Sequence, residues 1–138
     1  MIDESSEFGA RIAGHLREDV VVWLTTVSRS SGPVPSPVWF LWDGAESVLV
    51  YSMPSARVRN LTANARVSLN FDGDRRGGDI VVLSGTAVEE PEAPPADANS
   101  DYLAKYHGLI ERIGHTPESF AEKYCVPLRV RIDRIRGH

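Results

Sequence analysis

Residues 51–64 read Y-S-M-P-S-A-R-V-R-N-L-T-A-N, and they contain a change from a strand to a helix. The apolar run that enters this segment is typical of a β-strand and stops at Ser52. Pro54 then interrupts the extended backbone, because its nitrogen cannot donate to a sheet ladder. Ser55 stands where a serine can cap the N-terminus of a short helix, predicted over about 55–63.

Two arginines, Arg57 and Arg59, fall in the first turns of this predicted helix. Free N–H groups at a helix N-terminus attract anions, and a guanidinium binds a phosphate with a planar fork. Together with the hydroxyls of Ser52 and Ser55, the arginines therefore form a candidate phosphate site. The alternative is a strand, a turn and a surface helix whose arginines are solvated.

Outward from this segment, β-branched and aromatic runs separated by turn residues predict six strands. Asp43-Gly44 is a hairpin signal between two of them, and Gly85 indicates a bulge or a close backbone approach in another. The predicted strands span 20–28, 34–42, 47–52, 66–72, 79–89 and 126–135.

Helical spacing of apolar residues and capping signals predict three further helices, over 5–18, 99–113 and 116–124. Six strands joined by short turns, with helices at the start, middle and near the end, favour a small antiparallel barrel. The expected fold class is mainly β (α+β), in one domain over 1–138, because 138 residues suit one domain and no internal boundary is evident.

The strand over 34–42 begins V-P-S-P, so Pro35 and Pro37 remove two ladder donors and exclude a regular central strand in its first half. The interrupted pairing leaves backbone groups free to contact a ligand, and the rings of Trp39 and Phe40 can line a site for a flat heterocycle. The alternative is an edge strand whose aromatic residues belong to the core. The Asp43-Gly44 turn would pair this strand with the one that ends at the candidate phosphate site. The two features together predict a site for a flat ring joined to a phosphate.

The composition restricts the partners and the compartment. The net charge is −4, which makes a nucleic acid an unlikely ligand, and the apolar runs are too short to span a membrane. The single cysteine, Cys125, excludes an intrachain disulfide, and the acidic N-terminus does not resemble a secretory signal, so a cytoplasmic protein is expected. Cys125 itself is expected to be a buried structural thiol.

Familiar catalytic constellations do not occur in the sequence. There is no phosphate loop, no dinucleotide fingerprint, no nucleophile elbow and no metal-ligand spacing, so no metal is expected and the catalytic residues stay unknown. Tyr102 and Tyr106 lie one helical turn apart, which favours core packing or a dimer contact over proton donation. If the protein is an enzyme, a bound cofactor would therefore supply the reactive group.

The order and spacing of these motifs resemble the pyridoxamine 5'-phosphate oxidase-like flavin-binding split barrels. The sequence is most similar to the actinobacterial branch that uses the deazaflavin coenzyme F420. The likeness covers nearly the whole chain, and rests on P-S-P-V-W-F, the D-G doublet, residues 51–64, R-V-S-L-N-F and the terminal strand. It implies a six-stranded antiparallel split β-barrel that forms a homodimer, with the cofactor at the interface.

By this resemblance the cofactor phosphate would contact Ser52, Ser55 and Arg57, with Arg59 as a further candidate. Arg57 replaces the usual lysine of the family motif. The ring of the cofactor would lie along the backbone of Ser36, Pro37, Val38 and Trp39. Four more arginines are candidate contacts for the oligoglutamate tail of F420, with solvated surface arginines as the alternative: Arg11, Arg17, Arg75 and Arg76.

The resemblance implies an oxidoreductase that transfers hydride between F420 and an unknown small organic acceptor. The chain ends R-I-R-G-H and lacks the arginine-rich C-terminal segment of the true oxidases, which argues against pyridoxamine-phosphate oxidation. Two alternatives stay open. One is an FMN-binding split-barrel oxidoreductase, and the other is a non-catalytic carrier of a flavin or a tetrapyrrole.

Overall fold

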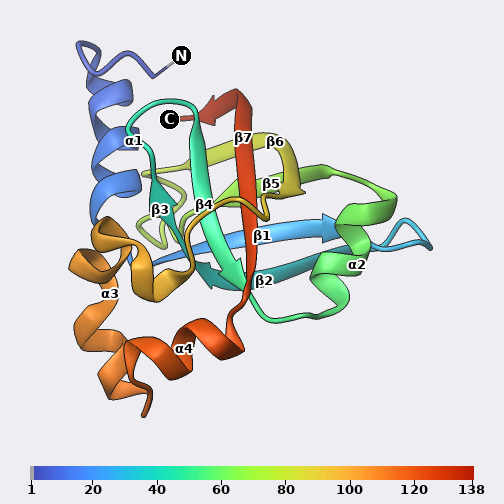
Figure 1. Ribbon diagram of the computed structural model, residues 1–138. Coiled ribbons are helices and arrows are strands. Elements are labelled where there is room, and N and C mark those ends of the chain that lie inside the picture. Colours follow the sequence, from blue (N-terminus) through green and yellow to red (C-terminus); the bar gives the residue numbers. More distant parts are fainter. Residues whose placement is uncertain (1) are drawn as a thin grey trace.

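The computed structural model describes residues 2–138 (Figure 1). Its strands are β1 (Val21–Val27), β2 (Pro33–Trp39), β3 (Leu41–Trp42), β4 (Ser47–Ser52), β5 (Arg66–Asn70), β6 (Val81–Glu89) and β7 (Val126–Gly137). Its helices are α1 (Glu7–Glu18), α2 (Ala56–Ala63), α3 (Ser100–Arg112) and α4 (Pro117–Lys123), with a short 3₁₀ helix, η1 (Ala96–Ala98).

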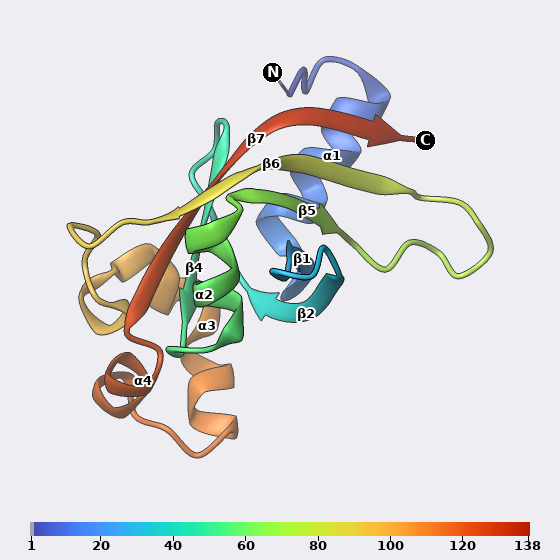
Figure 2. The same cartoon turned by 90° about the vertical axis from the view of Figure 1, so that its right-hand side faces the viewer.

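All these strands form one antiparallel sheet in the order β2-β1-β5-β6-β7-β4-β3. The two edge strands, β2 and β3, are consecutive in the chain and are separated by Phe40 alone. One continuous stretch therefore occupies both edges, and the sheet curls into a split barrel (Figure 2). The predicted class is confirmed, with seven strands in place of six because the stretch 34–42 divides at Phe40.

The break at Phe40 is held by the hydroxyl of Tyr106 in α3. The Phe40 N–H donates to this hydroxyl at 2.8 Å, in place of a strand partner. The hydroxyl lies 2.7 Å from the Val20 carbonyl oxygen and 2.9 Å from that of Phe40, so its proton has two acceptors. Both Tyr106 and Phe40 are fully buried. The predicted packing role of Tyr106 thus includes satisfying the backbone where the sheet changes edges.

Strand β4 lies between two hydrophobic cores, which explains why its sequence is apolar without alternation. Val48 and Val50 face the barrel interior, among residues of β1, β5, β6 and β7. Leu49 and Tyr51 face a second core built with α3 and α4. The strand therefore joins the barrel to the helical layer on the side where Ser52 ends it.

Two local predictions had different outcomes. The bulge at Gly85 is confirmed, because the register between β6 and β7 shifts between Ser84 and Gly85. A β-carbon there would lie 1.8 Å from the Arg131 carbonyl oxygen, so only glycine fits. The prediction of a buried Cys125 was wrong: this residue falls in the short link between α4 and β7 and is exposed.

The helices surround the curled sheet: α1 and α3 follow one another along one side, α4 lies below it and α2 lies on the opposite side (Figure 1; Figure 2 gives a second view). Their capping residues follow the sequence signals in α1 and α4. Ser6 accepts a hydrogen bond from the Gly9 N–H, and Thr116 and Ser119 form a reciprocal capping box. Among residues 2–138, no helix combines the length and the apolarity that crossing a membrane requires.

Helix α1 is attached to the loop before β6 by a cluster of charges around His15. Its ring nitrogens lie 2.7 Å from Asp19 and 3.0 Å from Asp79, and its ring stacks on Phe71. Arg11 also contacts Asp79, at 3.0 Å. Burial alone would lower the pKa of His15, but the hydrogen bonds that its ring donates to Asp79 and Asp19 outweigh it and raise the pKa. The hydrogen bond from His15 holds the pKa of Asp79 below its usual value.

We predict that Tyr106→Phe destabilises the protein by about 2 kcal/mol, because the buried Phe40 N–H then lacks an acceptor. Chemical denaturation measures this loss. Tyr102→Phe is the matched control, since Tyr102 is equally buried on the same helix but does not contact the break. Equal stability of the Tyr106 variant and wild type would show that the hydroxyl does not hold the break at Phe40.

A second prediction concerns pH. The native state binds the His15 proton more tightly than the unfolded chain does. This contribution is therefore complete below pH 6.5, the ordinary histidine value, and is lost as the pH rises through the native pKa. On the acid side, the contribution of Asp79 is lost as the pH falls through its lowered pKa. His15 should thus contribute more to the free energy of unfolding at pH 5.5 than at pH 8.5.

We accordingly expect His15→Gln to lower the free energy of unfolding by about 1 kcal/mol more at pH 5.5 than at pH 8.5. Urea denaturation at the two pH values measures the difference. His107→Gln is the control, because the contact of His107 with Glu111 is exposed and long, at 3.8 Å. A pH-independent effect of His15→Gln would contradict the assignment of a charged His15.

Candidate functional site

Arg57 is held where β2 and the end of β4 approach the first turn of α2. Its Nε donates to Ser36 Oγ at 3.1 Å, and its Nη1 donates to Ser52 Oγ at 2.8 Å. The Ser52 hydroxyl, which is buried, in turn donates to the Met53 carbonyl oxygen at 2.8 Å. The two serines therefore fix the guanidinium from two strands, and both use their oxygen lone pairs to do so.

The charge of Arg57 has no counter-charge among the described residues. Its side chain is half-buried, and this burial lowers its pKa. None of the ion pairs formed within residues 2–138 includes it. Buried charges are normally paired, because desolvation otherwise costs several kcal/mol. An arginine that stays charged and is held by neutral hydroxyls alone is suited to receive an anion.

Ser55 precedes α2 at the N-cap position, but the predicted capping bond is absent. Its backbone is nearly fully extended, with φ −157°, whereas the capping residues Ser6 and Thr116 have φ near −90°. The difference turns its side chain away from the first N–H groups of the helix. The Oγ of Ser55 is buried without any hydrogen-bond partner among the described residues. An unsatisfied buried hydroxyl costs stability, and a missing ligand is one explanation.

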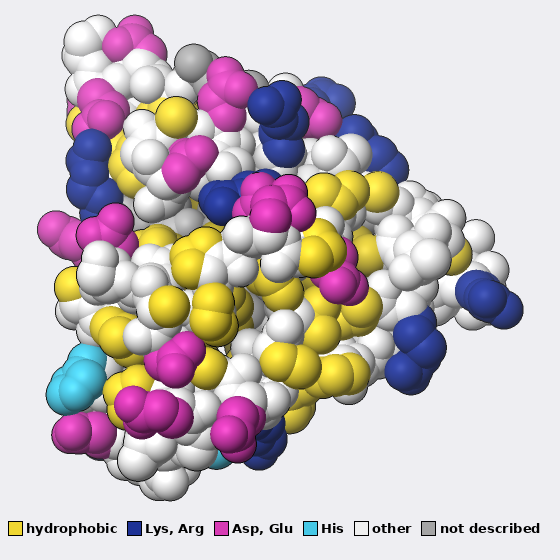
Figure 3. Space-filling model, viewed as in Figure 1, with side chains coloured by type: hydrophobic (Ala, Val, Ile, Leu, Met, Phe, Trp, Pro, Cys, Tyr) yellow, Lys and Arg dark blue, Asp and Glu magenta, His cyan; other side chains and the backbone are white. Residues whose placement is uncertain are grey.

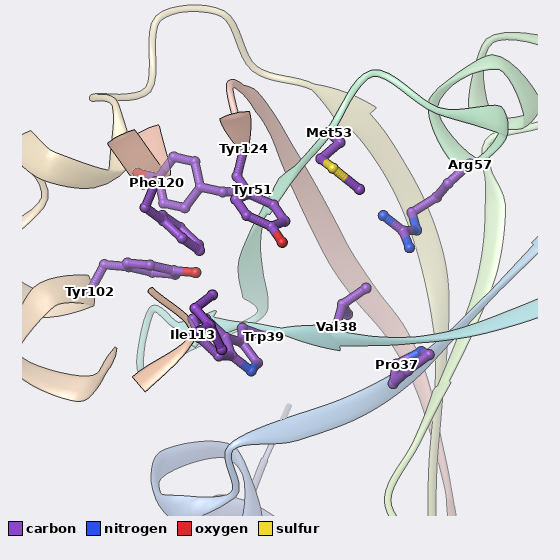
Figure 4. Close-up of a pocket in the computed structure, with 10 residues that line it drawn as sticks. All are labelled: Pro37, Val38, Trp39, Tyr51, Met53, Arg57, Tyr102, Ile113, Phe120 and Tyr124. Carbon is purple, nitrogen blue, oxygen red and sulfur yellow. The ribbon is translucent and has the colours of Figure 1, made fainter. Parts of the chain in front are cut away.

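We call Arg57, Ser36 and Ser52 the anion seat. Beside it lies a cavity of about 240 Å³. Arg57 occupies one end of this cavity and aromatic rings occupy the other, with Met53 and Val38 between them (Figure 4). The lining residues are Pro37, Val38, Trp39, Tyr51, Met53, Arg57, Tyr102, Ile113, Phe120 and Tyr124.

The aromatic end is rigid because its rings are stacked. Trp39 lies parallel to Tyr106, with centroids 4.8 Å apart, and nearly parallel to Phe120, at 5.6 Å. Phe120 continues the stack to Tyr124, at 4.3 Å. Strand β2 is thereby fixed against α3 and α4, and the cavity has a preformed apolar wall.

The chemistry of the lining is that of binding and positioning. Among the described residues, the lining contains no carboxylate, histidine or cysteine, and Arg57 is its one charged member. Burial raises the pKa of Tyr102 far above its usual range, so its hydroxyl stays protonated and can only donate or accept a hydrogen bond. The cavity could hold a flat molecule with an anionic group at the Arg57 end. It lacks the acid–base pair that hydrolysis requires.

The structure brings most of the predicted site residues together. Pro37, Val38 and Trp39 line the cavity, and Ser36, Ser52 and Arg57 form one hydrogen-bonded group. Arg59 does not join them: it is exposed on α2 and lies outside the lining.

Sequence reasoning missed the contribution of the C-terminal helices to this cavity. Phe120 and Tyr124, four residues apart at the end of α4, and Ile113, after α3, fall within the predicted helices 116–124 and 99–113, and all three line the cavity. Their spacing places both aromatic residues on one helix face. Nothing in the sequence, however, indicates that this face meets β2. Two arginines considered for an acidic tail are already engaged, Arg11 with Asp79 and Arg17 with Glu4.

Comparison with solved structures finds the same fold in proteins of different function. An F420 reductase has a TM-score of 0.62 and 20% identity, over 89% of this chain and 94% of its own. The heme storage protein HutZ of Vibrio cholerae has a TM-score of 0.64 and 16% identity, over 96% and 95%. A conserved hypothetical protein of Mycobacterium tuberculosis has a TM-score of 0.67 and 23% identity, over 95% and 82%.

At these identities the structures establish the fold alone. A search of curated proteins by sequence found no match. The family model described as pyridoxamine 5'-phosphate oxidase, in contrast, matches residues 8–138, which is nearly the entire sequence. This match includes β2, β4, α2 and the anion seat, and the chain therefore belongs to the pyridoxamine 5'-phosphate oxidase family.

Proposed function

We propose that the protein is an oxidoreductase that transfers hydride between coenzyme F420 and a small organic acceptor. The observation that carries this proposal is Arg57, a half-buried cation without a counter-charge at one end of an aromatic-walled cavity. A ligand that combines an anionic phosphate with a flat ring would satisfy both ends. The family and the likeness to an F420 reductase support this choice of ligand.

The residues of the anion seat would divide the work of binding. Arg57 would contact the phosphate, since it lines the cavity and has unused donors. The buried hydroxyl of Ser55, which lies outside the lining, would join it through a shift of the turn before α2 on binding. Ser36 and Ser52 would position the guanidinium, because their oxygens already accept from it. The backbone of Pro37, beside its missing ladder donor, would face the ring. Arg59, which is exposed and outside the lining, would not contact the cofactor.

Bound F420 supplies the hydride-donating carbon, and the protein has to hold and shield it. The stacked Trp39 and Phe120 would keep water away from one side of the ring. The protonated Tyr102 could offer a hydrogen bond to a carbonyl group of the acceptor. A lining without carboxylates or histidines suits hydride transfer, which depends on orientation more than on acid–base groups.

A homodimer would complete the site. The cavity of about 240 Å³ is smaller than a typical pocket for a drug-sized ligand, which suggests that part of its wall is missing. Two lining residues, Met53 and Ile113, are exposed by 39% and 49% although both are large and apolar. Hydrophobic side chains gather in the middle of the face seen in Figure 3. A second copy of the chain, covering this region, would enclose the cofactor.

Two other ligands fit parts of the site. FMN also joins a flat ring to a phosphate, so the anion seat alone admits it. A carrier function is suggested by the fold of HutZ, described as a heme storage protein. The described lining offers no histidine, the usual axial ligand of heme iron, which favours a flavin-type ligand over a tetrapyrrole. A cytoplasmic location, where F420 and FMN are available, remains part of the proposal.

The test is to incubate the protein with F420, FMN or heme, and to record absorption spectra and calorimetric titrations. We expect F420 to bind, and the reduced form to pass hydride to at least one member of a panel of quinones and enones. Binding of FMN without F420 would replace the cofactor in this proposal. Binding of F420 without transfer to any acceptor would favour a carrier.

Arg57→Gln should weaken cofactor binding by about 1.5–3 kcal/mol, or roughly 10- to 150-fold, the value of a hydrogen bond to a charged group. Calorimetry measures the dissociation constant. Arg59→Gln is the matched control, because it makes the same change of charge two residues along the same helix, on an exposed side chain. Similar losses in both variants would indicate general electrostatic attraction, and would remove Arg57 from the site.

Ser55→Ala should separate binding from folding. Because the Ser55 hydroxyl is buried without a partner, its removal should leave the free energy of unfolding unchanged or raise it by up to about 1 kcal/mol. Cofactor affinity should nevertheless fall about tenfold. Ser6→Ala is the control: it removes a real helix cap, so it should cost about 1 kcal/mol of stability with no effect on affinity. A Ser55 variant with normal affinity would refute its role.

A further inference from the structure

Lys105 of α3 carries a half-buried amine that no carboxylate pairs with among the described residues. Its Nζ donates to the Phe40 carbonyl oxygen at 3.1 Å and lies over the Phe40 ring, 3.8 Å from the centroid. No ion pair within residues 2–138 includes Lys105. Burial is costly for an unpaired ammonium group, because the group loses water without gaining a counter-charge. The position therefore favours the neutral form of the amine.

A second cavity, of about 420 Å³, includes Lys105 in its lining. It is built by α1, α3 and β3, on the side where the two helices follow one another along the edge strand of the sheet (Figure 1). Its apolar wall consists of Leu16, Leu41, Trp42 and Ala104. It shares no lining residue with the cavity beside the anion seat, so the two sites are independent. A volume of this size suits a small molecule.

The charges around Lys105 leave its amine partly unprotonated near neutral pH. Burial lowers the pKa of Lys105 to about 8, and the charge of Asp19 opposes this only in part. The other charged side chains of the lining are Arg17, which already pairs with a carboxylate, and Asp101. The Tyr106 hydroxyl stays neutral, because burial raises its pKa. About one tenth of Lys105 is then a free amine at pH 7, against roughly 0.04% of an ordinary lysine.

We propose that Lys105 is a site of reversible covalent modification, where an uncharged aldehyde with an aromatic or branched aliphatic body forms an imine. The lone pair of the amine forms a bond to the aldehyde carbon. The carbonyl oxygen then leaves as water with the two protons of the amine, and the imine nitrogen takes up one proton from solvent. No oxidant or reductant is consumed. The product is an iminium group, which keeps a positive charge and one N–H.

The surroundings of Lys105 suit this product. The single N–H of the iminium can donate to the Phe40 carbonyl oxygen as the amine does, and its charge can lie over the Phe40 ring. An acyl group would remove the charge, so an aldehyde retains more of these contacts than an acylating agent would. The body of the aldehyde would lie against the apolar wall. Because Arg17 and Asp101 have opposite charges, the rest of the lining favours an uncharged body.

The test is to treat the full chain with benzaldehyde and sodium cyanoborohydride, which reduces the imine to a stable secondary amine, and to map the product by peptide mass spectrometry. The chain has two lysines. Lys123 is the internal control, because it is exposed and its Nζ also lies over a ring, that of Tyr124, at 5.9 Å. At pH 7 we expect Lys105 to be labelled at least tenfold faster than Lys123. Equal rates, or faster labelling of Lys123, would overturn the proposal.

Two further measurements separate a binding site from an amine that is merely reactive. Acetylation by trace acetic anhydride, which attacks only the neutral amine, should give Lys105 a midpoint near pH 8. A midpoint of about 10.4, the ordinary lysine value, would contradict the proposal. The rate of benzaldehyde labelling at Lys105 should saturate, because the aldehyde binds in the cavity before it reacts. A rate that stays proportional to the benzaldehyde concentration would show that no such complex forms, and would overturn the proposal.

Ala104→Phe tests the cavity itself. Ala104 lines the cavity at an exposed position of α3, so a larger ring can occupy the space beside Lys105 without disturbing the core. Benzaldehyde labelling of Lys105 should fall at least fivefold, with less than a twofold change in its acetylation. His107→Phe is the matched control, because it adds the same ring to an exposed position of α3 outside the lining, and it should change neither reaction. Unchanged benzaldehyde labelling in Ala104→Phe would show that the cavity does not hold the aldehyde.

Discussion

The hydrogen bond from the Phe40 N–H to the Tyr106 hydroxyl is the constraint on which the architecture depends. It satisfies the backbone at the one residue where the chain leaves the β1 edge of the sheet and begins to pair with β4. Without an acceptor there, the break would leave a buried donor unpaired, and a continuous strand would be favoured. A continuous strand cannot occupy both edges, so the sheet could not curl in this way. The curl brings Ser36 of β2 and Ser52 of β4 within reach of one arginine.

That arginine is held at some cost to the fold. A half-buried guanidinium without a carboxylate and a buried hydroxyl without a partner are both unfavourable in the protein alone. A carboxylate beside Arg57 would improve stability, but it would occupy the guanidinium and repel a phosphate. Two serines hold the side chain in place and leave its charge available. If the seat holds an anion, as we propose, it is ordered before the anion arrives, which lowers the cost of ordering it on binding.

Much of this arrangement could be predicted from the sequence, because it depends on local signals. β-branched and aromatic runs between turn residues indicated the strands, the Asp43-Gly44 doublet indicated a hairpin, and Gly85 indicated the bulge. The errors concern properties that depend on distant residues. The division at Phe40 depends on a hydroxyl 66 residues away, and the exposure of Cys125 depends on how α4 turns into β7. For the same reason, the sequence places Ser55 and Arg59 near one helix end but does not show that the Ser55 hydroxyl is buried and that Arg59 is exposed outside the cavity lining.

The separation of the cavity into a charged end and an aromatic end bears on how one fold can serve different ligands. The barrel fixes the position of the seat through β2 and β4, whereas the opposite end is built by α3 and α4 from the insertion between β6 and β7. An F420 reductase and a heme storage protein share this fold, so the sheet itself does not choose the ligand. The choice has to come from side chains at the two ends. At the barrel end lies the charge of Arg57, and at the helical end the Trp39 stack forms a rigid apolar wall. Because the two ends stand on different segments, changes in the helical insertion can alter the aromatic end of the cavity without disturbing the hydrogen bonds that hold Arg57.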